Sequence, residues 1–95
     1  MNRNNINVSQ LQKISKAVKN LHTEIEIEAF FKELLTDSEI KTLSKRWCIL
    51  EMLEQGCTQR EIAKDLQVSL CKVTRGSRIL KNNKSVLAKC LIKEK

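Results

Sequence analysis

The stretch TQREIAKDLQVSLCKVTRGSRILK, residues 58–81, has the pattern of a helix-turn-helix. Ala63 is a small residue where two helices would cross, and Leu66 is an apolar residue at the end of the first helix. The segment 67–69 would form the turn, and Val73 would anchor the second helix in the core. Such a unit leaves the outer face of its second helix free to enter a DNA groove.

The positive charge of the chain lies on the same segment. The formal net charge is +7, made up of +1 in residues 1–35, −1 in residues 36–57 and +7 in residues 58–95. A basic module beside a nearly neutral remainder indicates a polyanion partner, although a solvated basic face on two ordinary packed helices would have the same charge. The side chains predicted to contact double-stranded DNA are Gln59, Arg60, Lys64, Ser69, Leu70, Cys71, Lys72, Thr74, Arg78 and Lys81.

The rest of the chain predicts further helices. Its 95 residues include no Pro and two Gly, and the β-branched residues are scattered, so we expect an all-α fold. Capping boxes predict helix starts after Ser9, Thr36 and Thr58, and Gly56 is placed to end a helix. The helices are expected over about 10–22, 25–34, 37–55, 59–66, 70–81 and 84–92, with Leu87, Cys90 and Leu91 on one face of the last.

Cysteine usage favours a reducing, cytoplasmic protein without a metal. Cys48, Cys57, Cys71 and Cys90 are spaced 9, 14 and 19 residues apart, and none forms a CxxC pair. No apolar run suggests a signal segment or a membrane span. The lone His22 has no matching nucleophile, and no phosphate-binding loop is present, so we expect no catalytic site.

Gly76 is unusual because it falls inside a predicted helix, where glycine costs about 1 kcal/mol relative to alanine. Two interpretations are open. Another helix could approach closely at this position, or a planar ligand could fill a hollow there, with Arg75 binding its carboxylate. The spacing alone does not choose between them.

Three segments together resemble the tryptophan repressor family: LLTDSEIKTLSKRW (34–47), GCTQREIAKDL (56–66) and VTRGS (73–77). The resemblance implies a six-helix, intertwined homodimer that takes L-tryptophan as corepressor. Ligand binding would orient the helix-turn-helix units on a palindromic operator and block transcription of tryptophan biosynthesis or salvage genes. The implied organisation is a flexible arm, 1–8, and a single domain, 9–95. That domain would consist of dimerisation helices (9–57), the helix-turn-helix (58–82) and a C-terminal helix (83–95).

The resemblance also implies a ligand site. The indole would lie over Gly76 between Arg46 and Arg75, and the carboxylate would be held by Arg75 and by Thr36, which is also a helix cap. Backbone carbonyls preceding Thr36 would meet the ammonium, and Ile79 stands where the family usually has a serine. The set assigned to L-tryptophan is therefore Glu33, Leu35, Thr36, Arg46, Arg75, Gly76 and Ile79.

Other departures from the family concern the DNA-binding segment. Ala63 replaces the usual lysine, with Lys64 adjoining it, and Lys72 stands where a small polar residue is common. Lys72 and Arg78 are expected to strengthen phosphate contact. Two further functions stay open: a helix-turn-helix protein that binds DNA without ligand control, and a basic helical adaptor for an acidic protein partner.

Overall fold

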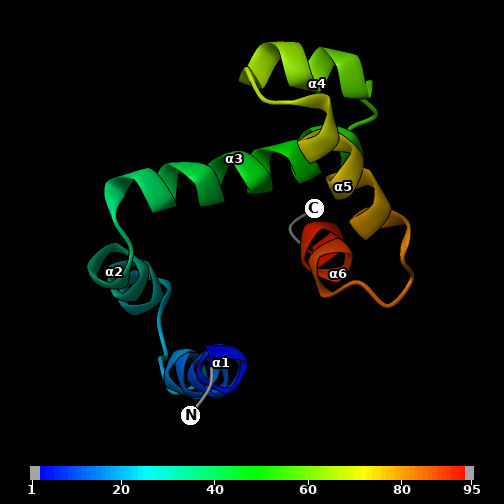
Figure 1. The fold of residues 1–95 in the computed structure, drawn as a ribbon. Helices are drawn as coiled ribbons and strands as arrows, with labels where there is room; N and C mark the ends of the chain where they lie inside the picture. Colours follow the sequence, from blue (N-terminus) through cyan, green and yellow to red (C-terminus); the bar gives the residue numbers. More distant parts are fainter. Residues whose placement is uncertain (1–2, 94–95) are drawn as a thin grey trace. The chain divides into compact units, whose positions relative to one another are not determined.

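The computed structural model describes residues 3–93, and this part of the chain is helical with no strand, which confirms the all-α prediction (Figure 1). The helices are α1 (Arg3–Lys19), α2 (Glu24–Leu34), α3 (Asp37–Glu54), α4 (Gln59–Leu66), α5 (Leu70–Lys81) and α6 (Val86–Lys93). The chain divides into two units, residues 1–40 and 41–95.

In the first unit, the predicted start of the first helix is wrong. α1 begins at Arg3, so Ser9 lies inside the helix and is not its N-cap. Residues 3–8 of the predicted arm are therefore helical, because no Pro or Gly there stops the helix from extending. The predicted second helix is confirmed, and Thr23 caps it by accepting the Glu26 N–H at 3.1 Å.

Apolar side chains of this unit remain in solvent. The exposed fractions are 63% for Leu11, 81% for Ile25 and 53% for Leu34, and no residue from 8 to 40 is buried. The described side chains of this unit therefore build no buried core of their own.

The second unit has a small core where the C-terminal half of α3 meets α4 and α5. Ile62 and Val73 are fully buried and contact Ile49 of α3. The partly buried side chains around them are Met52, Leu53, Cys57, Ala63, Leu66 and Val68. The inward positions predicted in 58–81 are thus confirmed.

The predicted end of α3 at Gly56 is confirmed. Gly56 has φ of +92°, the Gly56 N–H donates to Leu53 O at 3.1 Å, and the Cys57 N–H donates to Met52 O at 3.0 Å. This pair of hydrogen bonds is the Schellman motif, in which glycine takes the left-handed conformation at little cost. It turns the chain from α3 into the helix-turn-helix.

α6 buries one residue of its apolar face. Leu91 is 4% exposed, but Leu87 is 36% exposed and Cys90 is also exposed. Cys90 and Leu91 are adjacent and lie about 100° apart around a helix, so a short helix on one neighbour buries only one of them. Of the three residues that the sequence places on one face, Leu91 is the one that is buried in this unit.

Candidate DNA-binding and ligand sites

The α4–α5 connection has the capping that the sequence predicts. The Thr58 hydroxyl accepts the Glu61 N–H at 3.2 Å, and the Ser69 hydroxyl accepts the Lys72 N–H at 3.4 Å. Between the helices, Gln67 takes the left-handed conformation, with φ of 54° and ψ of 48°. These contacts define where α4 begins, where it ends and where α5 begins, which sets the geometry of a DNA-reading unit.

Replacing Gln67 with glycine should stabilise the protein. A non-glycine residue in the left-handed region is strained by about 1 kcal/mol, and glycine removes that strain at some entropic cost. We expect Gln67→Gly to raise the free energy of unfolding by about 0.5 kcal/mol, measured by urea denaturation at fixed protein concentration. Gln67→Val is the matched control and should lower the free energy of unfolding, because a β-branched residue is disfavoured in the left-handed conformation. If Gln67→Val raised it, residue 67 would not be left-handed in the folded protein.

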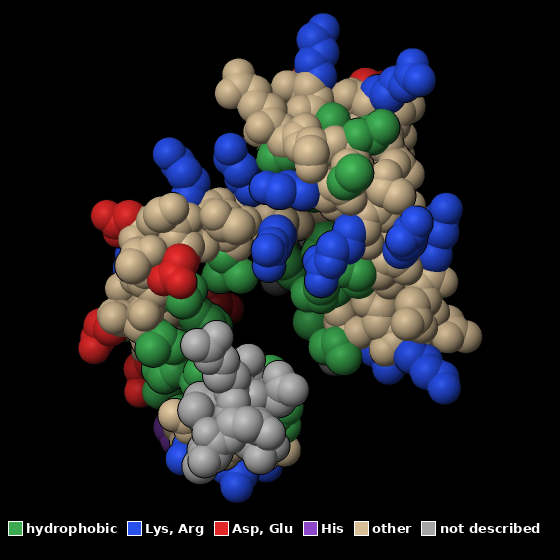
Figure 2. All heavy atoms as spheres, viewed as in Figure 1, with side chains coloured by type: hydrophobic (Ala, Val, Ile, Leu, Met, Phe, Trp, Pro, Cys, Tyr) green, Lys and Arg blue, Asp and Glu red, His purple; other side chains and the backbone are tan. Residues whose placement is uncertain are grey.

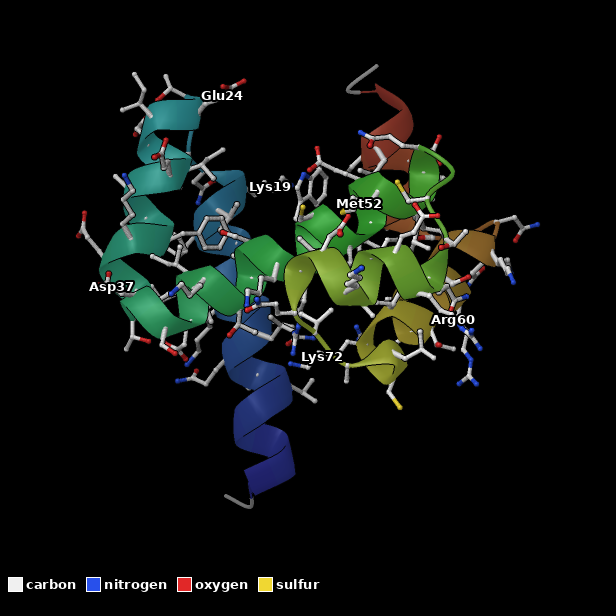
Figure 3. All side chains as sticks on the ribbon, turned by 90° about the horizontal axis from the view of Figure 1, so that it is seen from above. Lys19, Glu24, Asp37, Met52, Arg60 and Lys72 are labelled. Carbon is white, nitrogen blue, oxygen red and sulfur yellow. The ribbon has the colours of Figure 1, made fainter. Side chains whose placement is uncertain are left out.

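α5 is divided into a buried face and a basic face. Val73 and Gly76 are buried, whereas Lys72 and Arg75 are exposed. Figure 2 shows Lys and Arg side chains projecting over the part of the molecule that contains α4 and α5. Figure 3 places Arg60 in the first turn of α4 and Lys72 in the first turn of α5. The exposed members of the predicted DNA-contacting set are Arg60, Lys64, Ser69, Leu70, Cys71, Lys72, Arg78 and Lys81.

Two of the residues predicted to contact DNA, Gln59 and Thr74, contact each other. The Thr74 hydroxyl donates either to Gln59 Oε1 at 2.8 Å or to its own helix at Leu70 O, 3.0 Å away. Both side chains are half-buried. The bond ties the first turn of α4 to α5 across fifteen residues, and no local pattern in the sequence signals such a pair. Gln59 and Thr74 therefore position the helices, with the Gln59 NH₂ group left as a donor.

At Gly76, the structure supports close approach of a helix. A Cβ built on Gly76 would lie 3.1 Å from Ile49 Cγ2, 3.3 Å from Leu53 Cδ1 and 3.4 Å from Leu50 Cδ2. Contacts this short show that α3 already lies against Gly76 in this unit, which favours the first of the two interpretations. A role for Gly76 in ligand binding stays a prediction.

The other residues assigned to the ligand are divided between the two units. In the second unit, Arg46 and Arg75 are exposed and Ile79 is half-buried. In the first unit, Glu33 and Thr36 are exposed and Leu35 is half-buried. Exposed guanidinium groups are available to a carboxylate.

Thr36 is confirmed as a helix cap. Its hydroxyl accepts the Glu39 N–H at 3.2 Å, and its own N–H donates to Glu39 Oε1 at 2.9 Å. Hydrogen bonds to the Glu39 carboxylate, first from the backbone N–H and then from the side chain of Thr36, hold the pKa of that carboxyl below its ordinary value. Because the Thr36 hydroxyl already bonds the Glu39 carboxylate, it would have to give up that bond to donate to the carboxylate of a ligand.

No group of three or more His, Cys, Asp and Glu side chains gathers anywhere within residues 3–93. In the same range no helix has the length and apolar character to cross a membrane. Cys48, Cys57, Cys71 and Cys90 are free thiols.

The α4–α5 unit, with its buried face packed on α3 and its basic face exposed, defines a helix-turn-helix DNA-binding protein. The family profile described as "Trp repressor protein" matches residues 9–95. The chain therefore belongs to the Trp repressor family, whose members are transcriptional repressors rather than enzymes.

Curated relatives agree with this assignment. A "Trp operon repressor homolog" of Chlamydia caviae is 42% identical over 53 residues, which cover 55% of this chain and 52% of that protein. The homolog of the same name from Chlamydia trachomatis serovar D is 38% identical over 70% of this chain and 76% of that protein. The homolog from serovar L2 is 34% identical over 83% of this chain and 89% of that protein. The chain thus spans about half the length of the first relative and more of the others. No solved structure gives a significant match.

Proposed function

We propose that this protein is an L-tryptophan-dependent transcriptional repressor that binds a palindromic operator as a homodimer. Its regulated genes would be those of tryptophan biosynthesis or salvage. The observation that carries the proposal is the capped α4–α5 unit with an exposed basic face, in a chain whose Trp repressor match runs from residue 9 to 95. The exposed apolar side chains of α1 and α2 support the dimer, because a second copy would cover them.

In the proposed mechanism, tryptophan binding shifts the dimer between different arrangements of its two helix-turn-helix units. Two helix-turn-helix units bind a palindromic site when their α5 helices lie about one helical turn of DNA apart. A ligand favours that arrangement only if it binds it more tightly than the others. Arg46, Arg75 and Thr36 are the residues that would supply this difference, through the carboxylate and the indole of tryptophan.

The direct test is calorimetric titration of the protein with L-tryptophan, with tryptamine and L-phenylalanine as controls. We expect saturable binding at one site per chain, lost with tryptamine because it has no carboxylate for Arg75. Arg75→Ala should weaken tryptophan binding at least tenfold, since a charge-assisted hydrogen bond contributes about 1.5–3 kcal/mol. Arg78→Ala is the matched control, and an equal loss in both variants would count against a carboxylate site at Arg75.

A second function is favoured by the packing at Gly76. Ile49, Leu50 and Leu53 already lie against this glycine, so the α3–α5 contact is complete without a ligand. Under this alternative, the protein binds DNA without tryptophan. Electrophoretic mobility shifts with and without L-tryptophan separate the two: equal affinity in both conditions would favour the constitutive protein.

A further inference from the structure

The first turn of α5 carries a single strong hydrogen-bond donor, Lys72, in the position where helix-turn-helix proteins read bases. We propose that Lys72 contacts a guanine in each operator half-site and thereby sets the sequence preference of this protein. The proposal rests on the DNA-binding part of the proposed function. It assigns Lys72 to base reading, in place of the phosphate contact expected from its charge alone.

The position of Lys72 follows from the cap of α5. Its N–H donates to the Ser69 hydroxyl, so it lies in the first turn of the helix. Its neighbour Val73 is fully buried against Ile49 and Ile62, which directs the Lys72 side chain away from the core. Figure 3 shows Lys72 at this end of the helix. The N-terminal turn of the second helix is the part that contacts base edges in helix-turn-helix complexes.

The other side chains of residues 70–74 are weaker or engaged hydrogen-bonding groups. Thr74 is half-buried and its hydroxyl is engaged with Gln59 or Leu70. Leu70 is 48% exposed and has no polar group, and the Cys71 thiol is a weak donor. No ion pair of the Lys72 ammonium with a carboxylate is found among residues 3–93. Within residues 70–74 the ammonium of Lys72 is therefore the one strong donor free to meet a base.

The chemistry of an ammonium then selects the base. The group donates and cannot accept, and guanine is the base that presents two acceptors, N7 and O6, in the major groove. Adenine and cytosine present amino donors there, and thymine presents one acceptor beside a methyl group. Arg78 and Lys81 lie in the later turns of α5, where cations meet phosphates more readily than base edges.

The test is selection of duplexes from a random library, followed by sequencing, with the wild-type protein, Lys72→Ala and Lys72→Thr. Each selection is made with and without L-tryptophan, so that it does not depend on ligand control. We expect the wild type to enrich a guanine at one symmetric position per half-site, and both variants to lose about tenfold of that preference. Replacing this guanine with 7-deazaguanine should weaken wild-type binding and leave Lys72→Ala unchanged.

Lys81→Ala is the matched control, expected to weaken binding to all duplexes alike and keep the guanine. An equal loss on every duplex in Lys72→Ala, with a salt dependence lower by about one counterion, would make Lys72 a phosphate contact and overturn the proposal. DNA binding without any enriched guanine would overturn it while leaving the repressor function intact. No binding to DNA in either condition would refute the repressor function and, with it, the role of Lys72.

Discussion

Ile62→Ala is expected to lower the free energy of unfolding by about 3 kcal/mol and to abolish DNA binding. Ile62 is 0% exposed and contacts Ile49 of α3 and Val73 of α5, so it joins the three helices of the second unit. Truncating a buried isoleucine removes apolar contacts and leaves a cavity, at a cost of about 2–5 kcal/mol. The core around it is small, and a loss of this size is a large fraction of the stability of a chain of this length.

Urea denaturation followed by circular dichroism measures this effect. Protein concentration must be the same for all variants, because dimerisation would couple stability to concentration. Ile62→Val is the matched control and should cost about 1 kcal/mol, since only one methyl group is removed. Arg60→Ala, an exposed change in the same helix, should leave stability within about 0.5 kcal/mol. If Ile62→Ala cost no more than Ile62→Val, the side chain would not be the centre of this core.

The helix-turn-helix was predictable because its signals are local. The hydroxyls of Thr58 and Ser69 lie three residues before the N–H groups they accept, and this spacing can be read directly from the chain. Gly56 marked the end of α3 for the same reason. Even the turn at Gln67, which lacks the usual glycine, was predictable because the apolar residues on both sides define the two helices.

The sequence was a poor guide where tertiary contacts or weak helix propensities determine the structure. Ser9 has a cap-like sequence, but the preceding asparagines oppose a helix only weakly, and α1 runs through them. The Gln59–Thr74 hydrogen bond depends on how α4 and α5 cross, which one-dimensional spacing does not specify. Gly76 was compatible with a ligand or a helix, and only the positions of Ile49, Leu50 and Leu53 favour the helix.

Gly76→Val should destabilise the protein by about 2 kcal/mol in the absence of any ligand. A Cβ at this position would already lie 3.1 Å from Ile49 Cγ2 and 3.3 Å from Leu53 Cδ1, and valine adds two more carbons in this space. Overpacking a core costs about 1–3 kcal/mol. Gly76→Ala should stay within about 1 kcal/mol of wild type, because the gain in helix propensity offsets its close contacts.

A double-mutant cycle locates the cause. Leu53 is half-buried, so Leu53→Ala should be tolerated and would open space beside residue 76. If valine clashes with Leu53, the double variant Gly76→Val/Leu53→Ala should be more stable than the sum of the single changes predicts, by about 1 kcal/mol. If the losses of stability in the two single variants were additive, the valine would clash with a residue other than Leu53. If Gly76→Val were as stable as the wild type, α3 would not lie in close contact with Gly76. In that case the ligand interpretation of Gly76 would regain its original support, because a hollow would exist for tryptophan to fill.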